Sequence, residues 1–343
     1  MDISSTASAK AYAAPWTLTA YDRLPGNPVW IGIEFTVCLM LIFFVGRAFV
    51  EGATNSTPDD LRVAITQILI TAYSASAYAY LLMTARKTTH DLAPVAQFAP
   101  RWQTIVYRAG KHPRWLLPLI GAANFLVIGV SVTNATTPEP VNPWHWQSWS
   151  YDLYCHRATT VFFVWWIGCF CYVTVVESVR LSRLSEHIKS LDLLDMRPYE
   201  ALTRQGLTNA LLVIGMVSVL SLLAVESRYG PVLIGFWIAF IALAWIGLML
   251  PLRGIRKKIR GAKNQELDWC RQSLKAARNA LKSGTGVQQS IAEILAYKAV
   301  IENMRNWPFD NPTLIRFTLY LLIPLGSWLG GAFVERGLDL FLS

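Results

Sequence analysis

The chain has 343 residues, of which 53% are hydrophobic and only 15% are charged, and its formal net charge is +9. A typical soluble domain carries roughly 25% charged residues, so this composition excludes a soluble protein of this size. Five cysteines are too few for a disulfide-stabilised scaffold, and the apolar content excludes a disordered chain. We therefore expect an all-α, polytopic membrane protein.

Seven apolar stretches are long enough to cross the roughly 30 Å hydrocarbon core of a bilayer as helices. A membrane β-barrel would instead show short alternating segments, whereas these runs are continuous. The fifth stretch has the least clear start, because the polar residues Thr208 and Asn209 lie in its first turn. The predicted spans are residues 29–45, 63–83, 115–132, 158–176, 207–225, 231–252 and 313–334.

The distribution of Lys and Arg predicts the orientation of these spans, because cytoplasmic loops are enriched in both residues. Of the 31 Lys and Arg, 25 fall in segments 1–28, 84–114, 177–206 and 253–312, which alternate with the poorly charged loops. We therefore expect a cytoplasmic N-terminus and an outer C-terminus, in a bacterial inner (plasma) membrane. The predicted regions are a cytoplasmic segment 1–28, a six-helix membrane region 29–252 with short outer loops, a basic cytoplasmic hairpin 253–312, and a last membrane helix with the outer C-terminus 313–343.

The first three predicted spans carry polar side chains that are costly in hydrocarbon. Glu34 lies about one turn inside the first span, where it could favour cations, carry a proton, or pair with a nearby Lys or Arg. The second span bears a polar stripe at steps of four, three and four residues. This stripe could line a water-filled path or form hydrogen bonds between helices, for example with Asn124 of the third span. Its members are Gln67, Thr71, Ser74 and Tyr78.

The outer segment 144–157 is rich in Trp, Tyr and His. On a helix, one face would carry four side chains that can bind metals: His145, Asp152, His156 and the adjacent Cys155. The spacing matches no zinc motif, however, and the aromatic content favours a helix lying at the membrane surface. We therefore expect no metal and no cofactor.

The region between the sixth and seventh spans predicts a helical hairpin. Residues 255–283 and 287–306 have helix-forming sequences with apolar positions three and four apart, and glycines lie between them. A basic cluster opens the first helix. The cluster could simply fix the orientation of the chain in the membrane. Alternatively, it could bind an anionic ligand such as a lipid headgroup, a nucleotide or an oligonucleotide. The cluster comprises Arg253, Arg256, Lys257, Lys258, Arg260 and Lys263.

The seventh span combines Pro324 with Gly326, Gly330 and Gly331. Small residues four apart allow close helix approach, and proline loosens the helix. This segment could be a seam between subunits, a kink in a pore, or ordinary packing within the chain.

These patterns favour an oligomeric channel or pore-like protein that sits in the lipid bilayer and is gated through the basic hairpin. Catalytic signatures such as GxSxG and HExxH do not occur in the sequence, so we do not expect an enzyme. Alternatives are a membrane-anchored signalling or scaffold protein that recruits a cytoplasmic partner, and a secondary transporter. Seven spans with no evident internal repeat disfavour the transporter.

Overall fold

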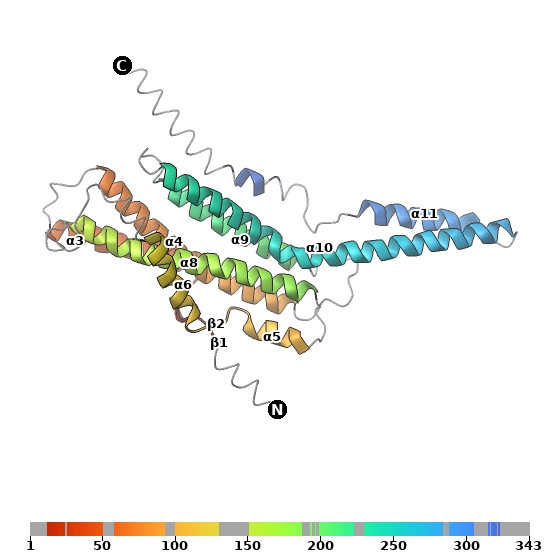
Figure 1. Cartoon of the computed structure of the whole chain (residues 1–343), viewed down its shortest axis with the longest axis horizontal. Coiled ribbons are helices and arrows are strands. Elements are labelled where there is room, and N and C mark those ends of the chain that lie inside the picture. The colour runs from red at the N-terminus through yellow and green to blue at the C-terminus, as the bar shows by residue number, and fades with distance from the viewer. Residues whose placement is uncertain are drawn as a thin grey trace, which may run out of the picture.

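The computed structural model describes residues 12–24, 26–50, 58–92, 100–129, 151–186, 193, 196, 199–222, 230–283, 288–304, 315, 317–320 and 322. These residues are almost entirely helical (Figure 1). A two-residue antiparallel pair joins β1 (Tyr12–Ala13) to β2 (His112–Pro113). The helices are α2 (Trp16–Arg23), α3 (Pro28–Val50), α4 (Pro58–Leu92), α5 (Pro100–Arg108), α6 (Leu116–Asn124) with a following π-helical turn η1 (Phe125–Gly129), α8 (Tyr151–Glu186), α9 (Glu200–Leu220), α10 (Gly230–Lys282) and α11 (Gln288–Asn303).

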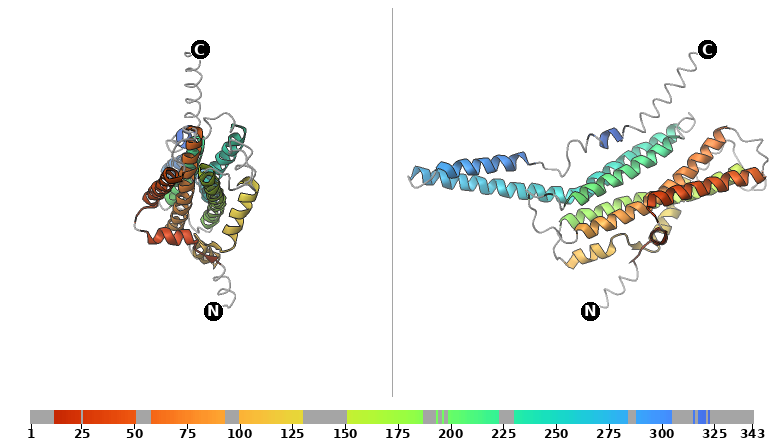
Figure 2. Two further views of the ribbon diagram at one scale, coloured as in Figure 1. Left: turned by 90° about the vertical axis from the view of Figure 1, so that its left-hand side faces the viewer. Right: turned by 180° about the vertical axis from the view of Figure 1, so that it is seen from behind.

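The centre of the fold is a bundle of α4, α8, α9 and α10, which run side by side in both views of Figure 2. Its apolar core includes Tyr78, Phe170 and Met216, all fully buried. Helix α3 packs along α4, and α6 packs along α8. The bundle thus follows from the apolar stretches of the sequence, which can bury their surface only against one another.

Four of the described helices are long and apolar enough to cross a membrane, as expected of an integral membrane protein: Pro28–Val50, Val63–Leu92, Tyr154–Glu186 and Gly235–Lys282. They correspond to the first, second, fourth and sixth predicted spans. The third prediction coincides with a shorter apolar helix, Leu116–Val127. Helix α9 covers most of the fifth but is not among the four, because its first half carries polar side chains. Most of the seventh lies outside the described residues.

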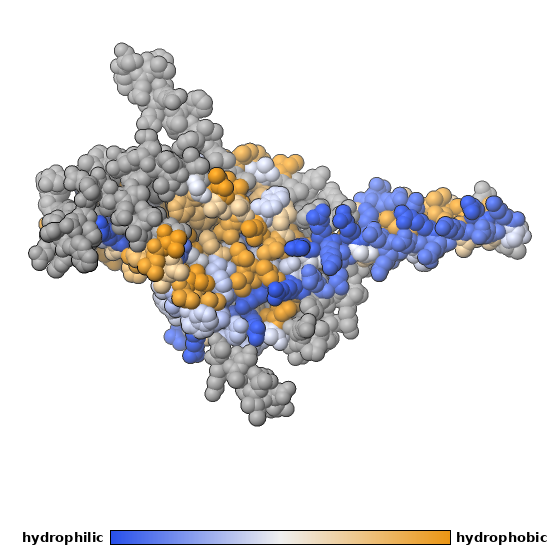
Figure 3. Space-filling model, in the orientation of Figure 1, coloured by the Kyte–Doolittle hydropathy of each residue, from blue (hydrophilic) through white to orange (hydrophobic). Residues whose placement is uncertain are grey.

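Helix α10 is 53 residues long and passes without a break from the bundle into a polar extension. The predicted boundary at 252/253 therefore falls inside a continuous helix. Helix α11 lies beside the distal part of α10, where Tyr297 donates a hydrogen bond to Glu266 (3.2 Å) and meets Trp269 edge to face. We call residues 253–282 together with α11 the rod. On the face shown in Figure 3, hydrophobic side chains gather over the bundle and hydrophilic ones cover the rod.

The segments rich in Lys and Arg meet at one end of the bundle. The end of α4 reaches the start of α9, where Thr88 donates a hydrogen bond to Gln205 (3.2 Å). The end of α8 packs against α10 at Gly254. A second apolar cluster closes this end and contains Leu184, Ile255 and Phe317. The structure thus brings together the segments 84–92, 177–186 and 253–264, which are far apart in the sequence.

Candidate functional site

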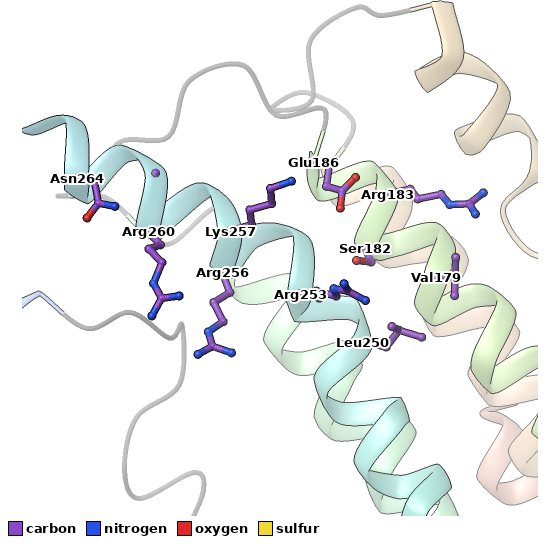
Figure 4. A pocket seen from close by; sticks show the side chains of 11 residues that line it. Val179, Ser182, Arg183, Glu186, Leu250, Arg253, Arg256, Lys257, Arg260 and Asn264 are labelled. Atoms are coloured by element: carbon purple, nitrogen blue, oxygen red, sulfur yellow. The ribbon is translucent and has the colours of Figure 1, made fainter.

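A cleft of about 750 Å³ opens between the end of α8 and the point where α10 leaves the bundle (Figure 4). We call it the basic cleft, because five of its side chains are cationic and only Glu186 is acidic. Leu250 and Val179 form its apolar edge on the side of the bundle. Such a surplus of positive charge beside an apolar rim suits an anion, particularly a phosphate, that is bound where a bilayer meets water. The cationic residues are Arg183, Arg253, Arg256, Lys257 and Arg260.

The periodicity of α10 aligns the cations of the basic cleft. Residues 253, 256, 257 and 260 fall on one face of the helix, as i, i+3, i+4 and i+7 do. The opposite face carries Ile255 and Ile259, which are buried in the second apolar cluster. One face therefore anchors the helix while the other presents charge. Gly254 permits the close approach of α8, since a Cβ there would overlap the Ser185 hydroxyl and the Ser182 carbonyl oxygen.

The structure divides the predicted basic cluster between two places. Arg253, Arg256, Lys257 and Arg260 line the cleft, and Lys258 is not among its lining residues. The Lys263 ammonium donates to the carbonyl oxygens of Glu302 (2.8 Å) and Met304 (2.7 Å), at the end of α11. A cation at a helix C-terminus satisfies carbonyls that have no partner within the helix. Lys263 thus holds the rod together.

Sequence reasoning missed the contribution of α8 to the basic cleft. Arg183 and Glu186 line it, three residues apart near the end of a predicted span. In the sequence they look like ordinary flanking charges of a membrane helix. Only the contact between α8 and α10 makes them part of one site.

On another face of α8, three ionisable side chains form what we call the Glu177 cluster. Glu177 and His112 are almost completely buried, and His112 Nε2 lies 3.1 Å from Glu177 Oε1. Arg180 donates to the same carboxylate oxygen. A buried carboxylate is strongly unfavourable without such partners. The cluster thereby joins β2 to α8.

Arg180 also ties α8 to the end of α5. Its Nη1 donates to the carbonyl oxygen of Arg108 (2.9 Å) and its Nη2 to that of Lys111 (3.1 Å). Gly110 makes the turn between them with a φ of 68°, a conformation that favours glycine. The sequence signal for this cluster was the spacing of Glu177 and Arg180, which are one helical turn apart. His112 is far from Glu177 in the sequence, and no sequence pattern indicated that the two residues would meet.

A buried amide network spans α4, α8, α9 and α10. Gln205 donates to Asn209 (2.7 Å) and to Thr84 (3.2 Å), and Asn209 donates to Ser178 (3.1 Å). Asn209 also lies 3.5 Å from the carbonyl oxygen of Gly247.

This last contact compensates for Pro251, which lies inside α10. Proline has no N–H, so the carbonyl four residues earlier, that of Gly247, loses its helical partner. The Asn209 amide supplies a donor in its place, although a weak one. The network therefore supports α10 at the point where it leaves the bundle.

The predicted polar stripe of α4 faces the interior of the bundle. Gln67 donates to Thr160 (3.0 Å) and accepts from Thr159 (2.9 Å), both on α8. The Thr71 hydroxyl donates to the carbonyl oxygen of Gln67 (2.7 Å). Ser74 and Tyr78 are also buried, and Ser74 donates to the carbonyl oxygen of Thr71 (3.0 Å). The structure thus brings the four stripe residues together in interhelical and intrahelical contacts within one chain.

The other two predicted polar-path residues lie apart from this stripe. Asn124 donates to the carbonyl oxygen of Val164 on α8 (2.6 Å), beside Gly168. Glu34 is exposed on α3 and points away from the bundle.

Most of the outer segment and of the last span falls outside the described residues. His145 is among the residues that are not described, and the side chain of Asp152 is not described either. Cys155 and buried His156 lie near the start of α8. Within the part of the chain that the structure describes, no three His, Cys, Asp or Glu residues are grouped to hold a metal ion. Pro324, Gly326, Gly330 and Gly331 also lie outside it.

Comparisons with known proteins give no family for this chain. No protein-family model matches the sequence, and no match was found among curated proteins or solved structures.

Proposed function

We propose that this chain is an oligomeric, pore-like membrane protein whose opening is controlled by a phosphate-bearing anion in the basic cleft. The cleft is the observation that carries the proposal. It holds five cations against one carboxylate, and four of the cations belong to the helix that continues into the membrane region. Because α10 is continuous, an anion that favours one position of the rod would also favour one position of the membrane segment. On the charge distribution, the cleft and the rod are cytoplasmic.

The contacts of α4 argue against a conduction path within a single copy of the chain. The polar stripe that could have lined a path within one copy is occupied by hydrogen bonds to α8 and to its own backbone. A pore would then be lined by surfaces that the single chain leaves exposed.

The binding step is tested with a charge variant and a matched control. The triple variant Arg253→Gln, Arg256→Gln and Arg260→Gln removes three cleft charges. The control, Lys275→Gln, Arg278→Gln and Lys282→Gln, has the same spacing on the distal part of α10, outside the cleft. Each cation near an anionic surface contributes about 1 kcal/mol, so we expect the cleft variant to bind about 100-fold more weakly and the control to bind normally.

The probes for this test separate two sources of the phosphate. Binding of soluble pyrophosphate to purified protein reports a soluble ligand. Binding that needs vesicles containing phosphatidic acid reports a lipid headgroup. Equal loss of binding in both triple variants would contradict the cleft as the binding site.

The pore step is tested by current through purified protein in planar bilayers, with and without the phosphate probe. Current that depends on the probe and is lost in the cleft variant would support the proposal. Silent bilayers combined with normal anion binding would instead favour a signalling protein. The rod offers that function a docking surface, because Trp269, Leu295 and Val300 are exposed on it.

A further inference from the structure

Helix α2 lies across the axis of the bundle, unlike the long helices beside it (Figure 2). Its eight residues extend for only about 12 Å, so it cannot cross a bilayer. The hydroxyls of Tyr21 and of Ser76 on α4 form a hydrogen bond (3.1 Å), and the rings of Trp16 and of Trp166 on α8 lie 6.2 Å apart. These two contacts hold α2 crosswise at one level of the bundle.

The packing of α2 also indicates which of its sides faces the membrane. On the predicted orientation α4 runs toward the cytoplasm, so Arg86, ten residues further along α4, lies closer to the cytoplasm than Ser76 does. Tyr21 reaches Ser76. Leu18 is buried beside Gly110, where a Cβ would lie 3.9 Å from both Leu18 and Arg86. The side of α2 next to Tyr21 therefore faces the membrane, and the side next to Leu18 faces the cytoplasm.

The exposed residues of α2 differ between these two sides. At about 100° per residue, Trp16, Ala20 and Leu24 share the side adjacent to the membrane-facing tyrosine. Leu24 keeps this spacing because its N–H donates to the carbonyl oxygen of Ala20 (3.1 Å). Trp16 is 75% exposed and Leu24 is 50% exposed, whereas the cytoplasmic side exposes Thr19 and Asp22. This division into an apolar and a polar side is typical of a helix that lies in the plane of a membrane surface.

Two neighbouring helices begin at the level of α2, and each begins beside an exposed tryptophan. Trp30 lies in the first turn of α3, two residues before Gly32, which packs on the serine that binds α2. Trp115 directly precedes α6. The carbonyl oxygen of Leu117 accepts a hydrogen bond from Cys169 of α8 (3.6 Å), one turn from the tryptophan that meets α2. Exposed tryptophans at one level are typical of the boundary between hydrocarbon and headgroups.

The elements on the cytoplasmic side of α2 are rich in cations. Strand β1, directly before α2, pairs with β2, which lies between Lys111 and Arg114. Arg108 and Lys111 each lie over a tyrosine ring, 4.4 and 3.7 Å from its centre. Arg114 is exposed, and so is Arg23 at the end of α2. Cations beside an exposed apolar surface suit the cytoplasmic leaflet, whose anionic headgroups attract Lys and Arg.

We propose that α2 is an in-plane helix of the cytoplasmic leaflet, with Trp16 and Leu24 in contact with lipid chains. The partner is the lipid surface itself, because the apolar side of α2, the exposed tryptophans and the cations follow one another from membrane to cytoplasm. This contact lies in the segment 1–28, which the distribution of Lys and Arg assigned to the cytoplasm. It does not depend on the pore function. Through the hydrogen bond of Tyr21, a displacement of α2 within the leaflet acts directly on α4.

Two spin labels on nearby residues test this placement in the full-length protein. Leu24→Cys carries a label on the apolar side, and Asp22→Cys carries the matched label on the polar side. Both variants also carry Cys38→Ala, because Cys38 is the only one of the five cysteines that is exposed. In vesicles of phosphatidylcholine and phosphatidylglycerol, the label's collisions with oxygen, which concentrates in hydrocarbon, are compared with its collisions with a water-soluble nickel chelate. We expect the ratio of oxygen to nickel accessibility to be several-fold higher for Leu24→Cys than for Asp22→Cys.

A label on the rod provides the reference for a position in water. Trp269→Cys, in the same Cys38→Ala background, serves this purpose because Trp269 is exposed on the polar extension of α10. A ratio for Leu24→Cys as low as that for Trp269→Cys would place α2 in water and overturn the inference. A Leu24→Cys label that both reagents reach poorly would also overturn it, because protein would then cover the apolar side, either another segment of the chain or a second copy. These measurements need neither current nor anion binding, so a negative result leaves the proposed function untouched.

Discussion

At the scale of single residues, the Glu177 cluster shows how a charge is kept inside the bundle. Glu177 is 1% exposed and relies on Arg180 and His112. In the sequence, Glu177 directly follows the fourth predicted span and Arg180 looks like a flanking charge, whereas His112 lies on a different element. Local periodicity in the sequence cannot predict contacts between polar groups that lie far apart in the chain.

Arg180→Met should destabilise the protein far more than the loss of a surface ion pair would. It leaves the Glu177 carboxylate buried without its main donor, which costs about 3–5 kcal/mol. We expect this decrease in the free energy of unfolding, measured by titrating detergent-solubilised protein with SDS and following Trp fluorescence.

A double variant provides the control for that experiment. Adding Glu177→Gln to Arg180→Met removes the unpaired charge and should restore part of the lost stability. A decrease below about 1 kcal/mol for Arg180→Met, the range of exposed pairs, would show that the cluster does not need its arginine.

At the scale of helices, the sequence predicted where α3, α4, α8 and α10 lie, but not that the sixth span and the helix after it are one continuous helix. Hydropathy changes sharply at Arg253, and the prediction divided the chain there. A change from apolar to polar residues does not interrupt a helix, however, when both sequences favour helix formation. Pro251 was no barrier either, because Asn209 of another helix supplies a donor to Gly247.

The close approach of α8 and α10 depends on Gly254, and a matched glycine tests this. Gly254→Ala would push a methyl group into Ser182 and Ser185, whereas a Cβ at Gly261 meets no atom within 4 Å. We expect Gly254→Ala to lose about 1–3 kcal/mol of stability, as overpacking does. Gly261→Ala should gain up to about 1 kcal/mol from helix propensity. The same SDS titration measures both, and equal effects would argue against tight contact at Gly254.

At the scale of the whole molecule, the charge distribution and the fold agree on which segments share an end. The sequence could group them only by counting Lys and Arg, and the bundle places 84–92, 177–186 and 253–264 together. The expectation that the chain crosses the membrane seven times stays a prediction. Polar side chains lower the hydropathy of α9, and the described apolar helix of the third prediction is short.

A labelling experiment at the two ends of the molecule tests the predicted orientation in the membrane. Ser283 is exposed at the tip of the rod and Phe49 is exposed at the opposite end of α3. An impermeant maleimide should modify Ser283→Cys in inside-out vesicles and Phe49→Cys in right-side-out vesicles, with the native chain as background. The reverse pattern would invert the topology and put the basic cleft outside the cell.

The continuity of α10 through Pro251 has a mechanical consequence. The 30 residues from Arg253 to Lys282 form an arm of about 45 Å at 1.5 Å per residue. A bend of only five degrees at its base would displace the tip by about 4 Å over that length. Asn209 contacts α10 at the base of this arm, so we expect a small rearrangement of its amide to displace the far end of the rod by several times as much.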